Sequence, residues 1–110
     1  MASALIVDDD EGVCTFVSLA LRKCGYEPRV ARSYGAAMSV LAERPFDLLL
    51  VDRDLQDGRD GLDIARFASE QHTESRICIM SGTPMDEAEV DYPVLAKPFL
   101  MSEFRAAIGG

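Results

Sequence analysis

Five short apolar runs divide this chain, and the stretches between most of them have the spacing of amphipathic helices. The runs cover residues 4–7, 28–31, 46–51, 77–80 and 94–96. Strands that alternate with helices are typical of an α/β fold, because parallel strands need a crossover connection. The third run is apolar without a two-residue alternation, which indicates a central strand covered on both faces. The sequence therefore predicts an α/β fold with a five-stranded parallel sheet.

Capping residues and breakers mark where the helices begin and end. The apolar face of the first helix stops at Gly25, while Ser33 and Asp60 are suited to cap the second and third helices. The segment 82–92 contains a proline and several acidic residues. It has room for about two helical turns. We expect a helix there to be short or absent.

Length, charge and cysteine content narrow the class of protein. A chain of 110 residues, 48% of them hydrophobic, suits one domain, which we take to span residues 1–110. The net charge of −8 argues against direct binding of nucleic acid, which needs clustered cations. Three cysteines without metal-ligand spacing suggest reduced thiols and a cytoplasmic location. No segment approaches the roughly 20 apolar residues of a membrane span.

Polar residues directly follow four of the apolar runs. They are Asp8, Asp9 and Asp10 after the first run, Asp52 after the third, Ser81 after the fourth and Lys97 after the fifth. Ligands of open parallel sheets bind beyond the carboxyl ends of the strands, so these side chains should share one pocket. Carboxylates gathered there repel one another unless a cation neutralises them. Mg²⁺, or Mn²⁺ in its place, is the hard cation suited to such oxygen ligands.

Charge counting supports that expectation. Asp8, Asp9 and Asp52 supply three negative charges, which a divalent cation and Lys97 would balance. A phosphoryl group added to Asp52 would bring fresh negative charge, which a hydroxyl donor such as Ser81 could move to meet. The pocket therefore has the composition of a phosphorylation switch.

Short motifs in this order resemble the signature set of response-regulator receiver domains. They are Ile6-Val7-Asp8-Asp9-Asp10, Leu50-Val51-Asp52, Leu55-Gln56-Asp57-Gly58, Met80-Ser81-Gly82 and Lys97-Pro98-Phe99. The resemblance covers nearly the whole chain. It implies a doubly wound sheet of the flavodoxin-like kind, with strand order 2-1-3-4-5.

The resemblance also implies a role for each site residue. Asp52 would be the phosphoacceptor. Asp9 and Asp52 would bind Mg²⁺ directly, Asp54 would bind it through its backbone carbonyl, and Asp8 would bind it through water. Ser81 would be the switch hydroxyl, and Lys97 would contact the phosphate. The implied partners are a histidine kinase or a His phosphotransfer protein, together with an unidentified output partner. The family also allows a homodimer. Such a domain is not an enzyme in the usual sense, since it catalyses only its own phosphorylation and autodephosphorylation.

Some positions depart from the family pattern. Val94 stands where receivers commonly carry an aromatic residue, and Tyr92 shares its strand parity but lies nearer the strand start. Leu100 replaces the polar cap expected for the last helix, which leaves Ser102 as a substitute. These changes put the usual output face in question.

An apolar patch is predicted beside the site. We expect Leu100 and Met101 to project close to the end of the first helix that carries Val13 and Phe16, and exposed apolar patches often mark partner surfaces. Our hypothesis is that this patch docks the helix bearing the donor histidine. In addition, the carboxylate of Asp54 should face the entering water and tune the phosphoryl lifetime. His72 is assigned no role.

Two other functions fit parts of the sequence. The apolar run before Asp52-Arg53-Asp54 also fits the nucleophile strand of haloacid-dehalogenase-type phosphatases, but Asp8 and Asp9 would then be unexplained. A degenerate receiver, acting as a phosphorylation-independent docking or dimerisation module, would suit the shortened segment 82–92. The intact acidic site favours the phosphoacceptor.

Overall fold

The computed structural model describes residues 1–56, 58–83 and 90–109. Its elements in chain order are β1 (Ala2–Val7), α1 (Glu11–Lys23), β2 (Tyr26–Ala31), α2 (Tyr34–Glu43), β3 (Leu48–Asp52), α3 (Gly61–Gln71), β4 (Arg76–Ser81), β5 (Val94–Ala96) and α4 (Met101–Ile108). The strands form one parallel sheet in the order β2-β1-β3-β4-β5. This confirms the predicted fold class and strand order.

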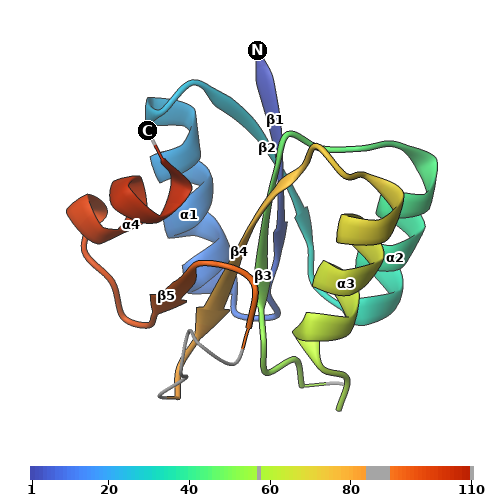
Figure 1. Cartoon of the computed structure of the whole chain (residues 1–110). Coiled ribbons are helices and arrows are strands. Elements are labelled where there is room, and N and C mark those ends of the chain that lie inside the picture. The colour runs from blue at the N-terminus through green and yellow to red at the C-terminus, as the bar shows by residue number, and fades with distance from the viewer. Residues whose placement is uncertain (57, 84–89, 110) are drawn as a thin grey trace.

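Helices cover both faces of the sheet (Figure 1). α1 and α4 lie on one face, and α2 and α3 lie on the other. All five residues of β3 are buried, with Leu48 and Leu50 packed toward α1 and α4, and Leu49 and Val51 packed toward α2 and α3. An apolar strand without alternation is therefore explained by two cores, one on each face.

Side-chain caps fix the starts of three helices. The amide of Val13 donates to Asp10 at 3.2 Å, that of Ala36 to Ser33 at 3.1 Å and that of Leu62 to Asp60 at 2.9 Å. Each cap satisfies an amide that has no partner within its helix. The caps predicted at Ser33 and Asp60 are confirmed.

The start of α4 differs from the prediction. Leu100 occupies the N-cap position, and its backbone amide donates to the carboxylate of Glu103 at 2.8 Å. The prediction of Ser102 as substitute cap was wrong, because Ser102 already lies inside the helix. Glu103, one turn into the helix, is the residue that reaches back to the cap amide.

The connection between β4 and β5 is only partly described. Residues 84–89, on which the short fourth helix was predicted, lie outside the described residues, and residues 82, 83 and 90–93 are not helical. Tyr92 precedes β5, and Val90, Tyr92 and Val94 pack, partly buried, against the core beneath α2 and α3. These side chains cover part of the sheet face next to α3.

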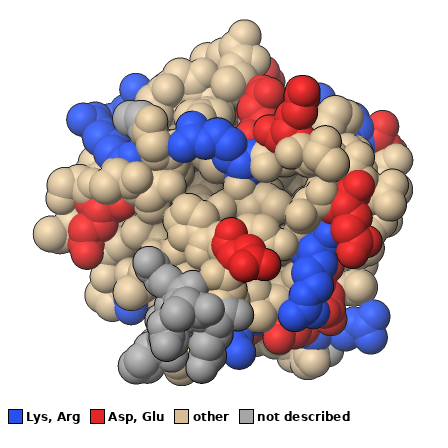
Figure 2. Space-filling view, viewed as in Figure 1, with Lys and Arg blue, Asp and Glu red and all other residues tan. Residues whose placement is uncertain are grey.

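Two further features concern the surface. On the face seen in Figure 2, basic and acidic side chains are interspersed.

His72 follows α3, and its Nε2 lies 2.8 Å from the carbonyl oxygen of Leu41 in α2, so its ring links two helices. Within the described ranges, the helices are all too short or too polar to cross a membrane.

Candidate functional site

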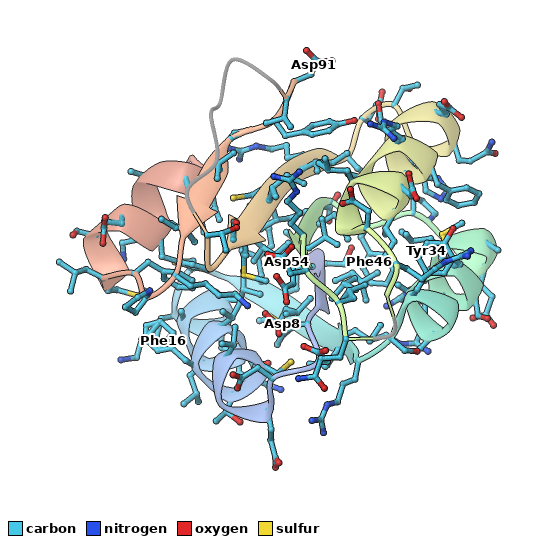
Figure 3. The ribbon with its side chains drawn as sticks, turned by 90° about the horizontal axis from the view of Figure 1, so that it is seen from below. Asp8, Phe16, Tyr34, Phe46, Asp54 and Asp91 are labelled. Atoms are coloured by element: carbon cyan, nitrogen blue, oxygen red, sulfur yellow. The ribbon has the colours of Figure 1, made fainter. Side chains whose placement is uncertain are left out.

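The polar residues picked out from the sequence meet at the carboxyl-terminal edge of the sheet. Asp8 follows β1, Asp52 ends β3, Ser81 ends β4 and Lys97 follows β5. Figure 3 looks onto this edge, and Asp8 and Asp54 lie near its centre between the flanking helices. Because all the strands are parallel, their ends bring residues from distant parts of the chain together.

Three carboxylates form the centre of the site. One oxygen each from Asp8, Asp9 and Asp52 lie within 4.8 Å of one another. Asp8 is fully buried and Asp52 is 4% exposed, whereas Asp9 is partly open to solvent. A hard divalent cation fits this set of oxygen donors, since it would offset repulsion that solvent cannot fully screen.

Lys97 supplies positive charge next to Asp8 and Asp52, the two buried carboxylates of the cluster. Its Nζ donates to Asp8 Oδ2 at 2.6 Å and lies 3.4 Å from Asp52 Oδ2. Burial by itself would lower the pKa of Lys97, but the hydrogen bond and charge of Asp8, followed by those of Asp52, raise it above its usual value. The lysine therefore stays protonated and bridges two of the three carboxylates.

Asp52 lies in an environment that opposes its ionisation. Burial raises its pKa, and the charge of Asp8 adds to that effect, while the backbone N–H of Asp54 and the charge of Lys97 act in the opposite direction. The Asp54 amide donates to Asp52 Oδ1 at 3.1 Å. Extra positive charge at this carboxylate would therefore stabilise its ionised form.

Asp9 is held by two groups that the sequence analysis did not identify. Its Oδ2 accepts a hydrogen bond from the backbone amide of Gln56 at 2.7 Å, and its carbonyl accepts one from Arg32 Nη2 at 3.1 Å. Both donors come from loops at the same sheet edge. A backbone amide carries no sequence signal, but the place of Arg32 directly after a predicted strand could have marked it.

Asp54 faces solvent beside the cluster. The side chain is exposed, and the residue forms an isolated antiparallel bridge with Asp60. Its backbone amide already bonds to Asp52, so the loop after β3 is anchored to the buried carboxylate. The ligand role of its carbonyl stays a prediction.

The hydroxyl of Ser81 makes its contacts with Thr83, two residues beyond the end of β4. Ser81 is buried, and its Oγ donates to the carbonyl of Thr83 at 2.8 Å and lies 3.3 Å from the Thr83 hydroxyl. A role as switch hydroxyl would require it to leave the Thr83 carbonyl.

The start of α3 approaches the backbone of Asp52 closely. The amide of Gly61 donates to the carbonyl of Arg53 at 2.9 Å. A Cβ atom built on Gly61 would overlap the carbonyl oxygen of Asp52. Only glycine allows this approach, which helps to fix the end of β3.

An apolar hollow of about 520 Å³ opens beside the acidic cluster. Its lining comprises Asp10, Gly12, Val13, Phe16, Lys97, Pro98 and Phe99. Phe16 is 41% exposed and meets Phe99 edge-on with ring centroids 5.7 Å apart, and Phe99 in turn stacks on Phe104. Of the four residues of the predicted patch, Val13 and Phe16 line this hollow, whereas Leu100 and Met101 lie outside the lining.

The two remaining patch residues differ in exposure. Leu100 is 69% exposed, whereas Met101 is partly buried against the core beneath α1 and α4. Phe99 joins the surface to the core and was missed as a patch residue. The signal for it was its place beside Lys97-Pro98, which we used only as a family motif.

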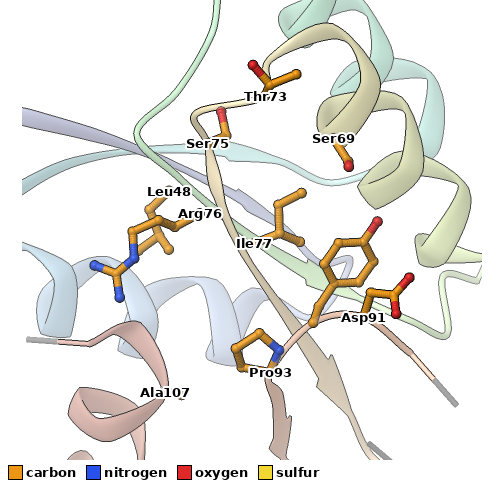
Figure 4. Close-up of a pocket in the computed structure, with 10 residues that line it drawn as sticks. Leu48, Ser69, Thr73, Ser75, Arg76, Ile77, Asp91, Pro93 and Ala107 are labelled. Atoms are coloured by element: carbon orange, nitrogen blue, oxygen red, sulfur yellow. The ribbon is translucent and has the colours of Figure 1, made fainter. Parts of the chain in front are cut away.

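A second hollow, of about 320 Å³, lies at the opposite end of the sheet (Figure 4). Its lining includes Ser69, Thr73, Ser75, Arg76 and Asp91, with Ile77 at its base. It is remote from the carboxylate cluster, and we assign it no chemistry.

Comparison with known proteins identifies the family. The family model described as "Response regulator receiver domain" matches residues 4–108. The response regulator receiver protein CpdR of Brucella abortus is 33% identical in an alignment of 105 residues that covers 90% of this chain and 87% of CpdR. The photosynthetic apparatus regulatory protein RegA of Rhodovulum sulfidophilum is 34% identical over 80 residues, which is 73% of this chain and 43% of RegA.

Solved structures agree on the fold. A response regulator from Burkholderia pseudomallei, solved with a phosphorylated aspartic acid, a calcium ion and citrate, aligns with a TM-score of 0.85 at 22% identity, over 97% of this chain and 66% of that chain.

This chain spans less than half of RegA and 18% of the length of the Pseudomonas aeruginosa regulator PilR. The family match decides against the haloacid-dehalogenase alternative. The chain belongs to the response regulator receiver family, whose members are signalling phosphoacceptors.

Proposed function

We propose that this chain, as one receiver domain over residues 1–110, accepts a phosphoryl group on Asp52 from a histidine kinase or a His phosphotransfer protein. The observation that carries the proposal is the position of Asp52. Its carboxylate is buried, lies in one cluster with those of Asp8 and Asp9, and is 3.4 Å from the Lys97 ammonium. A buried nucleophile with adjacent cation ligands and a lysine has what phosphoryl transfer needs, since that reaction depends on positioning and charge stabilisation.

The metal site proposed for this reaction uses residues of both loops. Asp9 and Asp52 would hold Mg²⁺ directly, with the Asp54 carbonyl, and Asp8 would contribute through water. When bound, the ion supplies two positive charges beside the reacting oxygens. Mn²⁺ could substitute because it accepts the same oxygen donors. The Burkholderia pseudomallei regulator was solved with both a phosphorylated aspartic acid and a calcium ion, which supports binding of a divalent cation by a domain of this fold.

The protein's own groups would then act in sequence. An oxygen of Asp52 attacks phosphorus, a P–O bond forms and the P–N bond of the donor phosphohistidine breaks. Lys97 already contacts Asp52 Oδ2, so it can follow the new charge onto the phosphoryl oxygens. Ser81 would exchange its bond to Thr83 for one to the phosphoryl group. That exchange would couple phosphorylation to the β4–β5 segment and so to the output partner.

Intact mass spectrometry tests the phosphoacceptor directly. Incubation with Mg²⁺ and acetyl phosphate should add one phosphoryl mass to the wild type, and none to Asp52→Asn, because an amide cannot replace the nucleophile. Excess chelator should also abolish the gain. An Asp47→Asn variant, altered at the far end of the sheet, is the matched control and should be phosphorylated. A wild type that stays unmodified would favour the degenerate docking module instead.

The donor partner is proposed to dock at the apolar hollow. Phe16 and Val13 line this hollow, and Phe16 is exposed. Leu100, outside the lining, is a second exposed apolar side chain, and Met101 beside it is partly buried. Folded Phe16→Asp and Leu100→Asp variants should accept phosphate from the cognate kinase slowly and from acetyl phosphate at the wild-type rate. Native rates from the kinase would end this part of the proposal.

We also propose a cytoplasmic location, which is supported by the presence of three cysteines and no disulfide among the described residues. Homodimerisation belongs to the same set of proposals, and sedimentation with and without phosphorylation would test it.

A further inference from the structure

Arg32 is a cation of the acidic edge that the proposed mechanism does not use. It directly follows β2, and its Nη2 donates to the carbonyl of Asp9 in the β1–α1 loop at 3.1 Å. β2 is at the opposite end of the strand order from β5, which Lys97 directly follows. The two cations therefore approach the acidic cluster from opposite sides.

The charge of Arg32 is less neutralised than that of Lys97. Lys97 is paired with both Asp8 and Asp52, whereas no carboxylate within the described ranges forms a salt bridge with Arg32. Its guanidinium nevertheless reaches the loop that carries the acidic cluster, through the 3.1 Å hydrogen bond to the carbonyl of Asp9.

The hydrogen bond from Arg32 is only one of several that hold this loop. The amide of Asp8 donates to Ala31 at 3.2 Å, the amide of Asp10 to the Asp8 carboxylate at 2.9 Å and the amide of Gln56 to the Asp9 carboxylate at 2.7 Å. Loss of the Arg32 side chain would leave these bonds in place. Its main contribution is therefore its charge.

We propose that Arg32 is a second, unneutralised cation of the pocket that weakens Mg²⁺ binding and attracts small anionic phosphodonors such as acetyl phosphate. Like charges repel, so the guanidinium opposes a divalent cation at Asp9. The same positive charge draws a dianionic donor toward a pocket that is otherwise acidic. The donor half of this inference rests on the proposed function, whereas the Mg²⁺ half depends only on the carboxylates.

Coulomb's law sets the size of the effect. In a water-like dielectric at low ionic strength, a unit positive charge near a divalent cation raises the dissociation constant of that cation several-fold. Screening at physiological ionic strength should reduce the change to about twofold. A salt-dependent shift separates this effect of charge from a structural one.

Two substitutions at Arg32 isolate its charge. Arg32→Gln removes the charge and keeps an amide donor, while Arg32→Lys keeps the charge. Arg29→Gln is the matched control: it makes the same change in net charge on β2, about 10 Å farther from the acidic edge. The readouts are the Mg²⁺ dissociation constant of unphosphorylated protein, by calorimetry, and the rate of phosphorylation by acetyl phosphate at saturating Mg²⁺.

The expected result is a pair of opposite shifts. At low salt, Arg32→Gln should bind Mg²⁺ several-fold tighter and react with acetyl phosphate several-fold more slowly, while Arg32→Lys and Arg29→Gln stay close to wild type. Unchanged or weaker Mg²⁺ binding in Arg32→Gln would overturn the inference, and an unchanged rate would overturn its donor half. A wild type that binds Mg²⁺ but is never phosphorylated would instead refute the proposed function.

Discussion

Replacing Gly61 with alanine should destabilise the protein through a collision with the backbone that carries Asp52. The added Cβ would overlap the carbonyl oxygen of Asp52 and come within 2.8 Å of its carbonyl carbon and 3.0 Å of the Cα of Arg53. All three atoms belong to the backbone of β3 and the residue after it, so no side chain can rotate out of the way. Separating the two segments would also stretch the hydrogen bond from Gly61 to the Arg53 carbonyl.

The expected loss follows from two opposing terms. Overpacking costs about 1–3 kcal/mol, and backbone contacts this close point to the upper end, about 3 kcal/mol. The better helix propensity of alanine offsets about 1 kcal/mol of this overpacking cost. The free energy of unfolding should therefore fall by about 2 kcal/mol. Gly35, in α2, is the matched control, because a Cβ there meets nothing within 4 Å. Gly35→Ala should gain about 0.5 kcal/mol.

Urea unfolding followed by circular dichroism measures both variants. With an m-value of about 1.2 kcal/mol/M, the two midpoints should differ by about 2 M, with the lower midpoint for Gly61→Ala. Gly61→Ala should also be phosphorylated more slowly, because the shift displaces the Asp52 carboxylate. Equal midpoints for the two variants would show that the close approach does not constrain this chain.

Other predictions address single groups. Asp54→Asn should lengthen the lifetime of the aspartyl phosphate by about two- to fivefold, because it removes a negative charge next to the phosphoryl group; unchanged autodephosphorylation would refute this. At pH 8 in the native protein, iodoacetamide should modify partly exposed Cys24 before Cys14, because Cys14 is buried and its pKa is raised by burial and by the charge of Asp8; peptide mapping at short times would show the order. Ser33→Ala should cost about 1 kcal/mol in urea unfolding, through loss of the cap on α2, and no loss would mean that the 3.1 Å bond contributes nothing.

The parts of the fold that depend on local pattern could be predicted from the sequence. The apolar run before Asp52 shows no alternation, and that property follows from burial on both faces. Ser33 and Asp60 were recognised as caps because a cap needs only the right side chain one turn ahead of an amide. The gathering of Asp8, Asp9 and Asp52 followed from parallel strands, since these always end at one edge.

The parts that depend on contacts across the chain could not be predicted. The Gln56 amide that binds Asp9 belongs to a residue 47 positions away, and backbone donors look the same in every sequence. The role of Phe99 depends on how its ring meets Phe16 and Phe104, which periodicity does not encode. At the start of α4, a polar residue was sought at the cap or just after it, whereas the acceptor is Glu103, one turn into the helix.

Both described ends of the chain lie away from the carboxylates. Ala2 begins β1, and the side chain of Arg76 at the start of β4 lies against Gly109, so both positions are at the amino-terminal edge of the sheet (Figure 1). A six-residue strand separates that edge from Asp8 by about 20 Å. An affinity tag or a sensor surface attached at either end would therefore leave the carboxylate cluster accessible. Such attachment suits binding assays in which this protein is immobilised and donor proteins are added.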